Sequence, residues 1–275
     1  MTSTSLEEFY NQYPRIEAAF DAALDESLHP RGPELLYEMV GNLRLPSEAT
    51  ILDLGCGEGQ HSIRLAESFR AAVHGVDPVP RHIELANERL DEAAQRNPEL
   101  RKRVRFELGA AESLPIQDTS IDLIWCCEVL YHVASLDKAF AECRRVLRPG
   151  GHMLIYHNFA TDRLEPREAE WWHRATPGTV SANADRQHVE VAFTDAGFEI
   201  EEYIELGSEF GEYAEETTGE PSRRLIHAAR LLRDPERHIA KFGQTNYDIM
   251  LGDCLWHIYR MIGKLSSRVF LLRTS

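Results

Sequence analysis

A glycine-rich turn at residues 53–60 is the segment whose residue types and spacing most clearly indicate chemistry. It reads Asp-Leu-Gly-Cys-Gly-Glu-Gly-Gln and lies between an apolar strand and a helix. Glycines at alternate positions let the backbone turn sharply and approach a ligand closely. A helix that begins directly after such a turn also directs its free N–H groups at the ligand. The turn therefore predicts a cofactor site.

The spacing of the glycines separates the two cofactor classes that use such a turn, dinucleotides and S-adenosylmethionine. In the dinucleotide pattern, GxGxxG, the third glycine comes three residues after the second. Here Gly55, Gly57 and Gly59 follow the pattern GxGxG, and Asp53 precedes the first of them by two positions. This spacing favours S-adenosylmethionine and disfavours a nicotinamide-dependent oxidoreductase.

Strands and helices alternate around the turn, and they must position it. Strands are expected at 50–54, 72–76, 104–108, 121–127 and 152–157, and helices at 61–69, 81–95 and 136–147. Such alternation indicates repeated βαβ units and a doubly wound, mostly parallel α/β sheet of Rossmann-like type.

The flanking segments predict four divisions of the chain. Residues 1–45 are expected to form a helical N-terminal lid, and residues 46–206 the cofactor-binding α/β core. A strand at 197–206 and a final strand at 266–272 are separated by about sixty mostly helical residues. We therefore expect a helical cap at 207–265, inserted into the edge hairpin of a seven-stranded sheet, with residues 266–275 returning to the core.

Composition excludes several classes of function. The chain has 30 basic and 45 acidic residues, a formal charge of −15, which argues against a nucleic-acid partner. Its mean hydropathy is −0.38, and no apolar run approaches the ~20 residues that span a bilayer. The N-terminus lacks the features of a secretory signal, and the five cysteines have no zinc-site spacing. We expect a cytoplasmic monomer or homodimer with reduced thiols and no metal.

Four segments in sequence order resemble the class I S-adenosylmethionine-dependent methyltransferases, in the branch that acts on small molecules. They are ILDLGCGEG, VHGVDPVPRHIELA, FELGAAESLPIQDTSIDLIWCCEVLYHV and LRPGGHMLIY, which cover residues 50 to about 157. The resemblance implies that S-adenosylmethionine donates a methyl group to an O, N or C atom of a small-molecule acceptor. The alternatives are a protein that binds the same cofactor for a non-methylating reaction or for regulation, and, less favoured, a protein- or nucleic-acid-modifying enzyme.

The resemblance also implies cofactor contacts at the strand ends. Asp77 is expected to accept hydrogen bonds from the ribose hydroxyls, with capping of the next helix as the alternative. Asp53 is expected near the methionine ammonium or ordering the glycine loop. The remaining expected contacts near the loop and the fourth strand come from Gly55, Cys56, Gly57 and Cys127.

The adenine side departs from the family pattern. Relatives often have Asp where this chain has Ala110, and alanine has no side-chain acceptor. Adenine recognition is then expected to depend on backbone groups near Ala111, on Glu112, or on apolar packing from residues such as Pro78. Tyr13, in the N-terminal helix, is expected to reach the cofactor, with simple amphipathic packing as the alternative.

The end of the fourth strand is expected to lie beside the reacting methyl. Alignment alone accelerates such a displacement, and a general base is needed only for a protonated acceptor. His132 is the leading candidate base because imidazole titrates near neutral pH, followed by Tyr131 and His157. The alternative for His132 is a histidine that only holds the loop.

Aromatic residues in the covering segments are candidates for the acceptor pocket. Aromatic walls with few polar groups are typical of pockets for ring-bearing molecules. We expect contacts from Trp172, Tyr213, Tyr247 and Trp256, with packing in the cap's own core as the alternative. Nine glutamates and no Lys or Arg lie between Glu199 and Glu220, which favours a neutral or cationic acceptor over an anionic one.

Overall fold

The computed structural model describes residues 5–274, and within them seven strands form one sheet in the order β3-β2-β1-β4-β5-β7-β6. The first five strands pair in parallel, and β7 is antiparallel to both β5 and β6. The strands are β1 (Thr50–Leu54), β2 (Ala72–Asp77), β3 (Val104–Leu108), β4 (Ile121–Cys127), β5 (Leu147–Ala160), β6 (Phe198–Gly207) and β7 (Leu265–Thr274). The predicted mostly parallel seven-stranded sheet is confirmed.

The strand β5 is longer than the sequence indicated. It begins at Leu147, which pairs with Ile121 of β4 across an irregularity, and it runs on to Ala160. Its second half pairs with β7 from His152 to Ala160. The Arg-Pro-Gly-Gly stretch at 148–151 resembles a turn locally, and the pairing of its flanking residues with distant strands lengthens β5.

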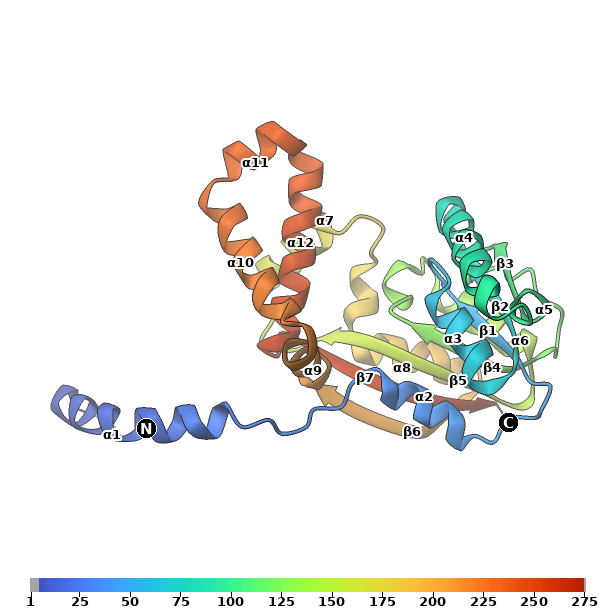
Figure 1. Ribbon diagram of the computed structural model, residues 1–275, viewed down its shortest axis with the longest axis horizontal. Helices are drawn as coiled ribbons and strands as arrows, with labels where there is room; N and C mark the ends of the chain where they lie inside the picture. The colour runs from blue at the N-terminus through green and yellow to red at the C-terminus, as the bar shows by residue number, and fades with distance from the viewer. Residues whose placement is uncertain (1–4, 275) are drawn as a thin grey trace.

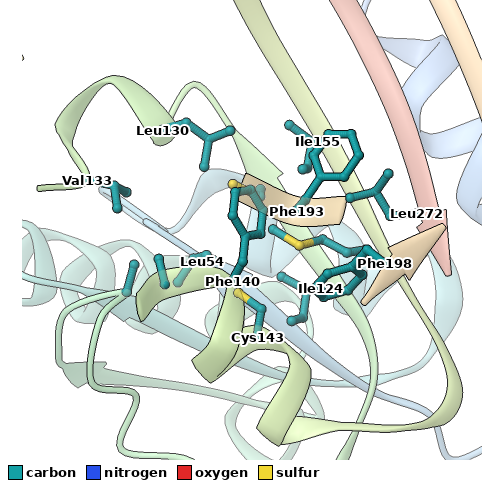
Figure 2. Packing of buried hydrophobic residues seen from close by; sticks show 14 of the residues in the cluster. Leu54, Ile124, Leu130, Val133, Phe140, Cys143, Ile155, Phe193, Phe198 and Leu272 are labelled. Carbon is teal, nitrogen blue, oxygen red and sulfur yellow. The ribbon is translucent and has the colours of Figure 1, made fainter. Parts of the chain in front are cut away.

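Alternate residues of the strands face two separate apolar layers. Leu52 and Ile124 face one layer, and their neighbours Ile51 and Trp125 face the other, as the two-residue period of a strand requires. The first layer is completed by α6 (Leu136–Val146) and α8 (Arg186–Asp195), whose Phe140 and Phe193 are seen in Figure 2. The second is completed by α2 (Glu34–Asn42), α3 (Gln60–Phe69), α4 (Pro80–Arg96) and α5 (Leu100–Arg103).

Further helices lie beyond the carboxyl end of β5 (Figure 1). Between β6 and β7 the chain forms α9 (Glu209–Thr218), α10 (Glu220–Arg233), α11 (Pro235–Phe242) and α12 (Gln244–Met261). The helix α7 (Pro166–Ala175) packs against α12. We call residues 208–264 the cap. None of the helices in residues 5–274 is long and apolar enough to cross a membrane.

The helix α1 (Leu6–Leu24) extends away from the rest of the molecule (Figure 1). Ser5 caps it by accepting a hydrogen bond from Glu8 N, but Phe9, Tyr13 and Phe20 on it remain about half exposed. The predicted position of Tyr13 over the cofactor site is therefore not found, because α1 does not fold back onto the sheet.

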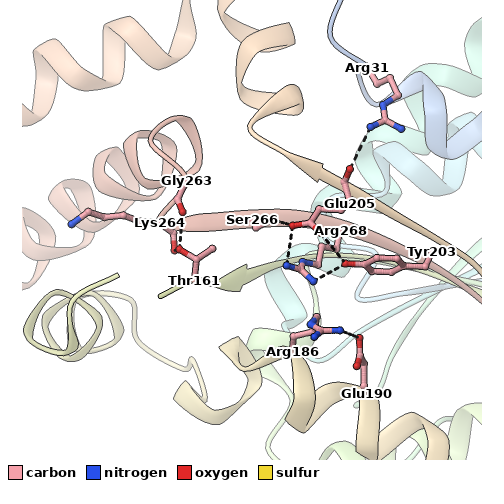
Figure 3. A network of polar contacts seen from close by, with 10 residues as sticks. All are labelled: Arg31, Thr161, Arg186, Glu190, Tyr203, Glu205, Gly263, Lys264, Ser266 and Arg268. Atoms are coloured by element: carbon pink, nitrogen blue, oxygen red, sulfur yellow. Dashed lines mark hydrogen bonds and ion pairs between the residues drawn. The ribbon is translucent and has the colours of Figure 1, made fainter. Parts of the chain in front are cut away.

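The segment after α1 is attached to the cap and to the edge of the sheet. Ser27 Oγ donates to Glu216 Oε2 of α9 at 2.8 Å, and Arg31 forms an ion pair with Glu209. Figure 3 shows Arg31 also reaching Glu205 of β6, whose carboxylate binds Arg268 of β7. These contacts fix where α1 leaves the body of the molecule.

Candidate active site

The glycine loop leaves an open cradle between β1 and α3. Gly57 has a φ of +51°, and a Cβ atom added there would meet no heavy atom within 4 Å. At Gly55, by contrast, an added Cβ would lie 2.5 Å from Val129 and clash. Gly55 therefore lets the loop pack on the core, while Gly57 faces space that a ligand could enter.

Asp77 ends β2 beside this cradle. Its Oδ2 accepts from Gly57 N at 3.0 Å, and its Oδ1 accepts from Val79 N at 2.9 Å and lies 3.0 Å from His82 Nδ1. Val79 is the N-cap residue of α4. Asp77 therefore orders the turn before α4 and the glycine loop, but it does not cap the helix, because α4 has no side-chain cap hydrogen bond.

Asp53 supports the loop from within the core. It is buried, and Ser62 Oγ of α3 donates to its Oδ2 at 2.5 Å. Burial raises the pKa of Asp53 to about 7, opposed by the hydrogen bonds from Ser62. This contact ties the end of β1 to the first turn of α3. The neighbouring Cys56 is buried, and burial raises the pKa of its thiol.

The three residues expected near adenine lie in different surroundings. Glu112 Oε1 accepts from Ala134 N at 2.8 Å and from Ser135 N at 3.2 Å, so this carboxylate holds the chain just before α6. Ala111 is buried and Pro78 is exposed. The expected adenine contact of Glu112 is not supported, because its side chain points to the N-terminus of α6.

A cavity of about 630 Å³ lies between the carboxyl end of the sheet and the cap. Cys127 and Glu128 reach it from the end of β4, and Tyr156 from β5. The other walls come from the start of α2, with Pro33 and Leu36, and from the cap, with Phe210, Tyr213, Trp256, His257 and Arg260. Of the four aromatic residues expected to hold the acceptor, Tyr213 and Trp256 are found here.

A chain of polar side chains crosses the floor of this cavity. Asn158 Nδ2 donates to Glu128 Oε1, and Asn158 Oδ1 accepts from Ser267 Oγ at 2.5 Å. Tyr156 OH donates to Ser267 Oγ at 3.2 Å and accepts from Arg260 Nη2 at 3.0 Å. The chain therefore connects a carboxyl group at the end of β4 with a guanidinium group of α12.

Glu128 is the titratable group of this floor with the most distinctive environment. Burial raises its pKa to about 7, although the charge of Arg260 and the hydrogen bond from Asn158 both act to lower it. Its backbone is held at φ +60°, an uncommon conformation for a residue other than glycine. This strained conformation directly after β4 turns the chain where the strand meets the cavity.

The three residues predicted as catalytic lie outside the cavity lining. His132 is exposed, with Nδ1 3.2 Å from Gly178 O. Tyr131 is buried and donates its hydroxyl hydrogen to Asn158 O. His157 is fully buried with Nε2 3.0 Å from Asn183 O, and burial lowers its pKa to about 4. Their assignment as bases is not supported by this arrangement.

Two of the aromatic residues expected to bind the acceptor pack elsewhere. Trp172 is 2% exposed and makes an edge contact with Tyr131 at a ring separation of 5.7 Å. Tyr247 is 8% exposed, lies in the apolar core of the cap, and donates to Leu231 O at 3.3 Å. Trp172 therefore packs in an apolar core, whereas Tyr247 packs in the cap core and also lines a separate cavity of about 650 Å³ within the cap.

The sequence did not identify three residues of the cavity floor as candidate functional residues: Glu128, Tyr156 and Arg260. A polar residue directly after a buried strand was an available signal for Glu128. The four-residue spacing of Trp256 and Arg260 on α12 placed both on one helix face. No sequence signal showed that this face would meet Tyr156.

Comparison with known proteins agrees with this geometry. Residues 52–155 match the family described as "Methyltransferase domain". The 27-O-demethylrifamycin SV methyltransferase of Amycolatopsis mediterranei (strain S699) is 34% identical over 133 residues, covering 48% of this chain and 47% of that protein. Such alignments span about half the length of the curated relatives.

Two solved structures share the fold at low sequence identity. Geranyl diphosphate C-methyltransferase from Streptomyces coelicolor A3(2) has a TM-score of 0.63 and 15% identity, covering 100% of this chain and 86% of that one. The [4+2]-cyclase SpnF has a TM-score of 0.66 and 19% identity, covering 96% and 94%. The family match lies on the glycine loop and the parallel strands described above, so residues 52–155 are similar to a methyltransferase domain in both sequence and fold.

Proposed function

We propose that the chain methylates a small molecule at a protonated nucleophilic atom, foremost a hydroxyl oxygen, with Glu128 as the proton acceptor. The observation that carries this proposal is the half-buried Glu128 on the floor of the cavity, whose carboxyl pKa is raised to about 7 by desolvation. A general base is most effective when its pKa lies near the working pH.

The cradle would hold the cofactor beside this carboxyl. The open face of Gly57 offers space, and Asp77 offers a carboxylate for hydroxyl groups, so the residues present fit S-adenosylmethionine. Asp53, Gly55, Cys56 and Cys127 complete the proposed surroundings of the cofactor. When bound, the cofactor supplies an electrophilic methyl group and leaves as S-adenosylhomocysteine.

The chain's own residues then align the acceptor and accept its proton. As the acceptor oxygen forms its new bond to carbon, the proton it loses goes to the carboxylate of Glu128. Asn158 holds Glu128 Oε1, which leaves Oε2 as the oxygen for this proton. Phe210, Tyr213 and Trp256 give the cavity aromatic walls that exclude water from the reacting atoms.

Glu128→Gln and His132→Ala test this proposal against the base predicted from the sequence. Binding of S-adenosylhomocysteine would be measured by calorimetry, and its release from S-adenosylmethionine would be followed with a panel of hydroxylated aromatic acceptors. We expect Glu128→Gln to retain cofactor affinity and to lose turnover by roughly 10²–10⁴-fold. His132→Ala should retain both, and normal turnover in Glu128→Gln would refute the role of Glu128.

A second candidate function is a reaction other than methyl transfer with the same cofactor bound. The observation that favours it is the fold similarity to SpnF, whose description is that of a [4+2]-cyclase. Release of S-adenosylhomocysteine distinguishes the two functions, because a non-methylating protein would leave S-adenosylmethionine intact throughout the acceptor panel.

A further inference from the structure

Arg260 of α12 is buried in the cavity with most of its hydrogen-bonding capacity free. Its residue exposure is 9%, and it lines the cavity beside Trp256. Its Nη2 donates to Tyr156 OH, while its buried Nε has no hydrogen-bond partner. A guanidinium carries five N–H donors in a planar fork; since Nε is buried, the donors that remain for a ligand are those of the two Nη atoms that do not bind Tyr156.

No carboxylate within the described residues forms an ion pair with Arg260. The arginines that do pair, such as Arg224 with Asp253 at 2.8 Å, lie outside the cavity lining. Burying an unpaired charge is costly unless something else compensates it. Two groups of the cavity act on this charge: the ring of Trp256, whose centre lies 4.4 Å from the guanidinium carbon, and the carboxyl of Glu128, whose pKa the charge of Arg260 acts to lower.

The guanidinium group of Arg260 and the carboxyl group of Glu128 both lie on the floor of the cavity. Asn158, Ser267 and Tyr156 connect them through consecutive hydrogen bonds, so both groups have defined positions. One end of the floor offers donors and the other a proton acceptor. A complementary acceptor molecule presents a hydrogen-bond-accepting oxygen to the first and an O–H group to the second.

We propose that Arg260 is the specificity-determining residue for an acceptor that carries, in addition to the methylated hydroxyl, a second, hydrogen-bond-accepting oxygen, as in a hydroxy-ketone or a hydroxy-carboxylate. This inference rests on the proposed function and adds the substrate class. Among the residues that line the cavity, Arg260 is the one with a permanent positive charge. A carbonyl or carboxylate oxygen would satisfy both its charge and its free donors.

The test uses three probes in the presence of saturating S-adenosylhomocysteine, with dissociation constants from calorimetry. The probes are 2-hydroxyacetophenone, 2-hydroxybenzoate and 2-ethylphenol, the last of which has the shape of the first without its carbonyl oxygen. We expect the two probes with a second oxygen to bind the wild-type protein at least about tenfold more tightly than 2-ethylphenol. Arg260→Met should abolish this difference.

Two further variants separate recognition from folding. Arg233→Met removes an exposed arginine from the end of α10, outside the cavity lining, and should preserve the discrimination. If Arg260→Met does not fold, Arg260→Lys decides, because lysine keeps the charge but lacks the planar fork. It should bind both oxygen-bearing probes at least about threefold less tightly than the wild type does.

The outcomes distinguish this inference from the proposed function. If the oxygen-bearing probes bind no more tightly than 2-ethylphenol, or if Arg260→Met retains the preference, the inference is wrong. The proposed function fails separately, through absent binding of S-adenosylhomocysteine or absent methyl transfer. A merely structural Arg260 would change the binding of all three probes equally.

Discussion

At the scale of single residues, the buried Asp53 and the half-buried Glu128 contribute to the pH dependence of stability. Asp53 near the end of β1 and Glu128 after β4 both have a pKa raised to about 7 by burial. The folded protein then keeps protons that the unfolded chain releases at lower pH. By linkage, the contribution of these two groups to the free energy of unfolding falls as the pH rises toward 7, whereas the lowered pKa of His157 acts in the opposite direction.

Glu128→Gln should reduce this pH dependence and stabilise the protein at alkaline pH. A neutral amide of nearly the same shape keeps an oxygen for Asn158 but needs no proton. Glu128 contributes a loss of stability between pH 4.5 and 7, on the order of 3 kcal/mol for its raised pKa. Urea unfolding at pH 5 and pH 8 would measure the difference, and parallel pH profiles for the two proteins would contradict it.

Asp77→Ala should weaken the binding of S-adenosylhomocysteine by about 1–3 kcal/mol, because hydroxyl groups and two backbone N–H groups lose a charged acceptor. His82→Ala is the matched control, since it removes a neighbour of Asp77 Oδ1 and leaves the carboxylate in place. Calorimetry gives both affinities. If Asp77→Ala folds normally and binds S-adenosylhomocysteine as tightly as the wild type does, Asp77 does not contact the cofactor.

At the scale of elements, the glycine loop and α12 form opposite sides of the site. The loop between β1 and α3 provides a cradle through its backbone, whereas α12 contributes side chains to the cavity. A substitution in the loop should therefore affect the cofactor, and one on the cavity face of α12 should affect the acceptor. The two effects are separable because different elements cause them.

Gly57→Val should abolish cofactor binding, because its side chain would enter the cradle and strain a positive φ. Gly207→Val is the matched control: Gly207 also has a positive φ, of +57°, and open space around its missing Cβ, but it ends β6. Both variants carry the same type of backbone strain. Binding by Gly57→Val at the level of Gly207→Val would show that the loop contacts no ligand.

Trp256→Ala should reduce acceptor turnover while changing the affinity for S-adenosylhomocysteine less than about twofold. The indole lines the cavity and supports the Arg260 guanidinium, but it has no place in the glycine loop. Leu251→Ala is the control for cap stability, since Leu251 is buried in the cap core away from the cavity and should cost about 2–5 kcal/mol. If both variants lose turnover equally, Trp256 acts through cap stability alone.

At the scale of the whole molecule, α1 contributes little to the stability of the body. Its apolar side chains remain about half exposed, and the chain is held at Ser27 and Arg31 instead. Removal of residues 1–24 should change the free energy of unfolding by less than about 0.5 kcal/mol, as for surface changes in general. Chemical denaturation measures this, and a larger loss would mean that α1 packs on the body in solution.

The same truncation tests the predicted N-terminal lid. In the structure α1 lies apart from the glycine loop (Figure 1), so the lid remains a prediction about the protein with its cofactor bound. If α1 forms a lid that places Tyr13 on the cofactor, removal of residues 1–24 should lower the affinity for S-adenosylhomocysteine. Unchanged affinity would leave α1 without a part in cofactor binding.

The sequence by itself determined the parallel core and the glycine loop. Both depend on patterns within short windows: apolar strands followed by helices, glycines at alternate positions, and Asp77 at a strand end. Backbone conformation and strand burial follow from local residue types, so the fold class and the cradle could be predicted. The hydrogen-bond partner of Glu112 and the packing of Trp172 and Tyr247 were not predicted, because a local window does not show which neighbour a side chain meets.

Only the tertiary structure decided the composition of the cavity floor. Glu128 and Arg260 stand 132 positions apart in the chain, and they share one floor because α12 leads into β7, which returns antiparallel to β5. That pairing brings Ser267 beside Asn158 and so joins the two ends of the polar chain. No local pattern encodes this contact, since it depends on the register of strands that meet only when the sheet closes around its core.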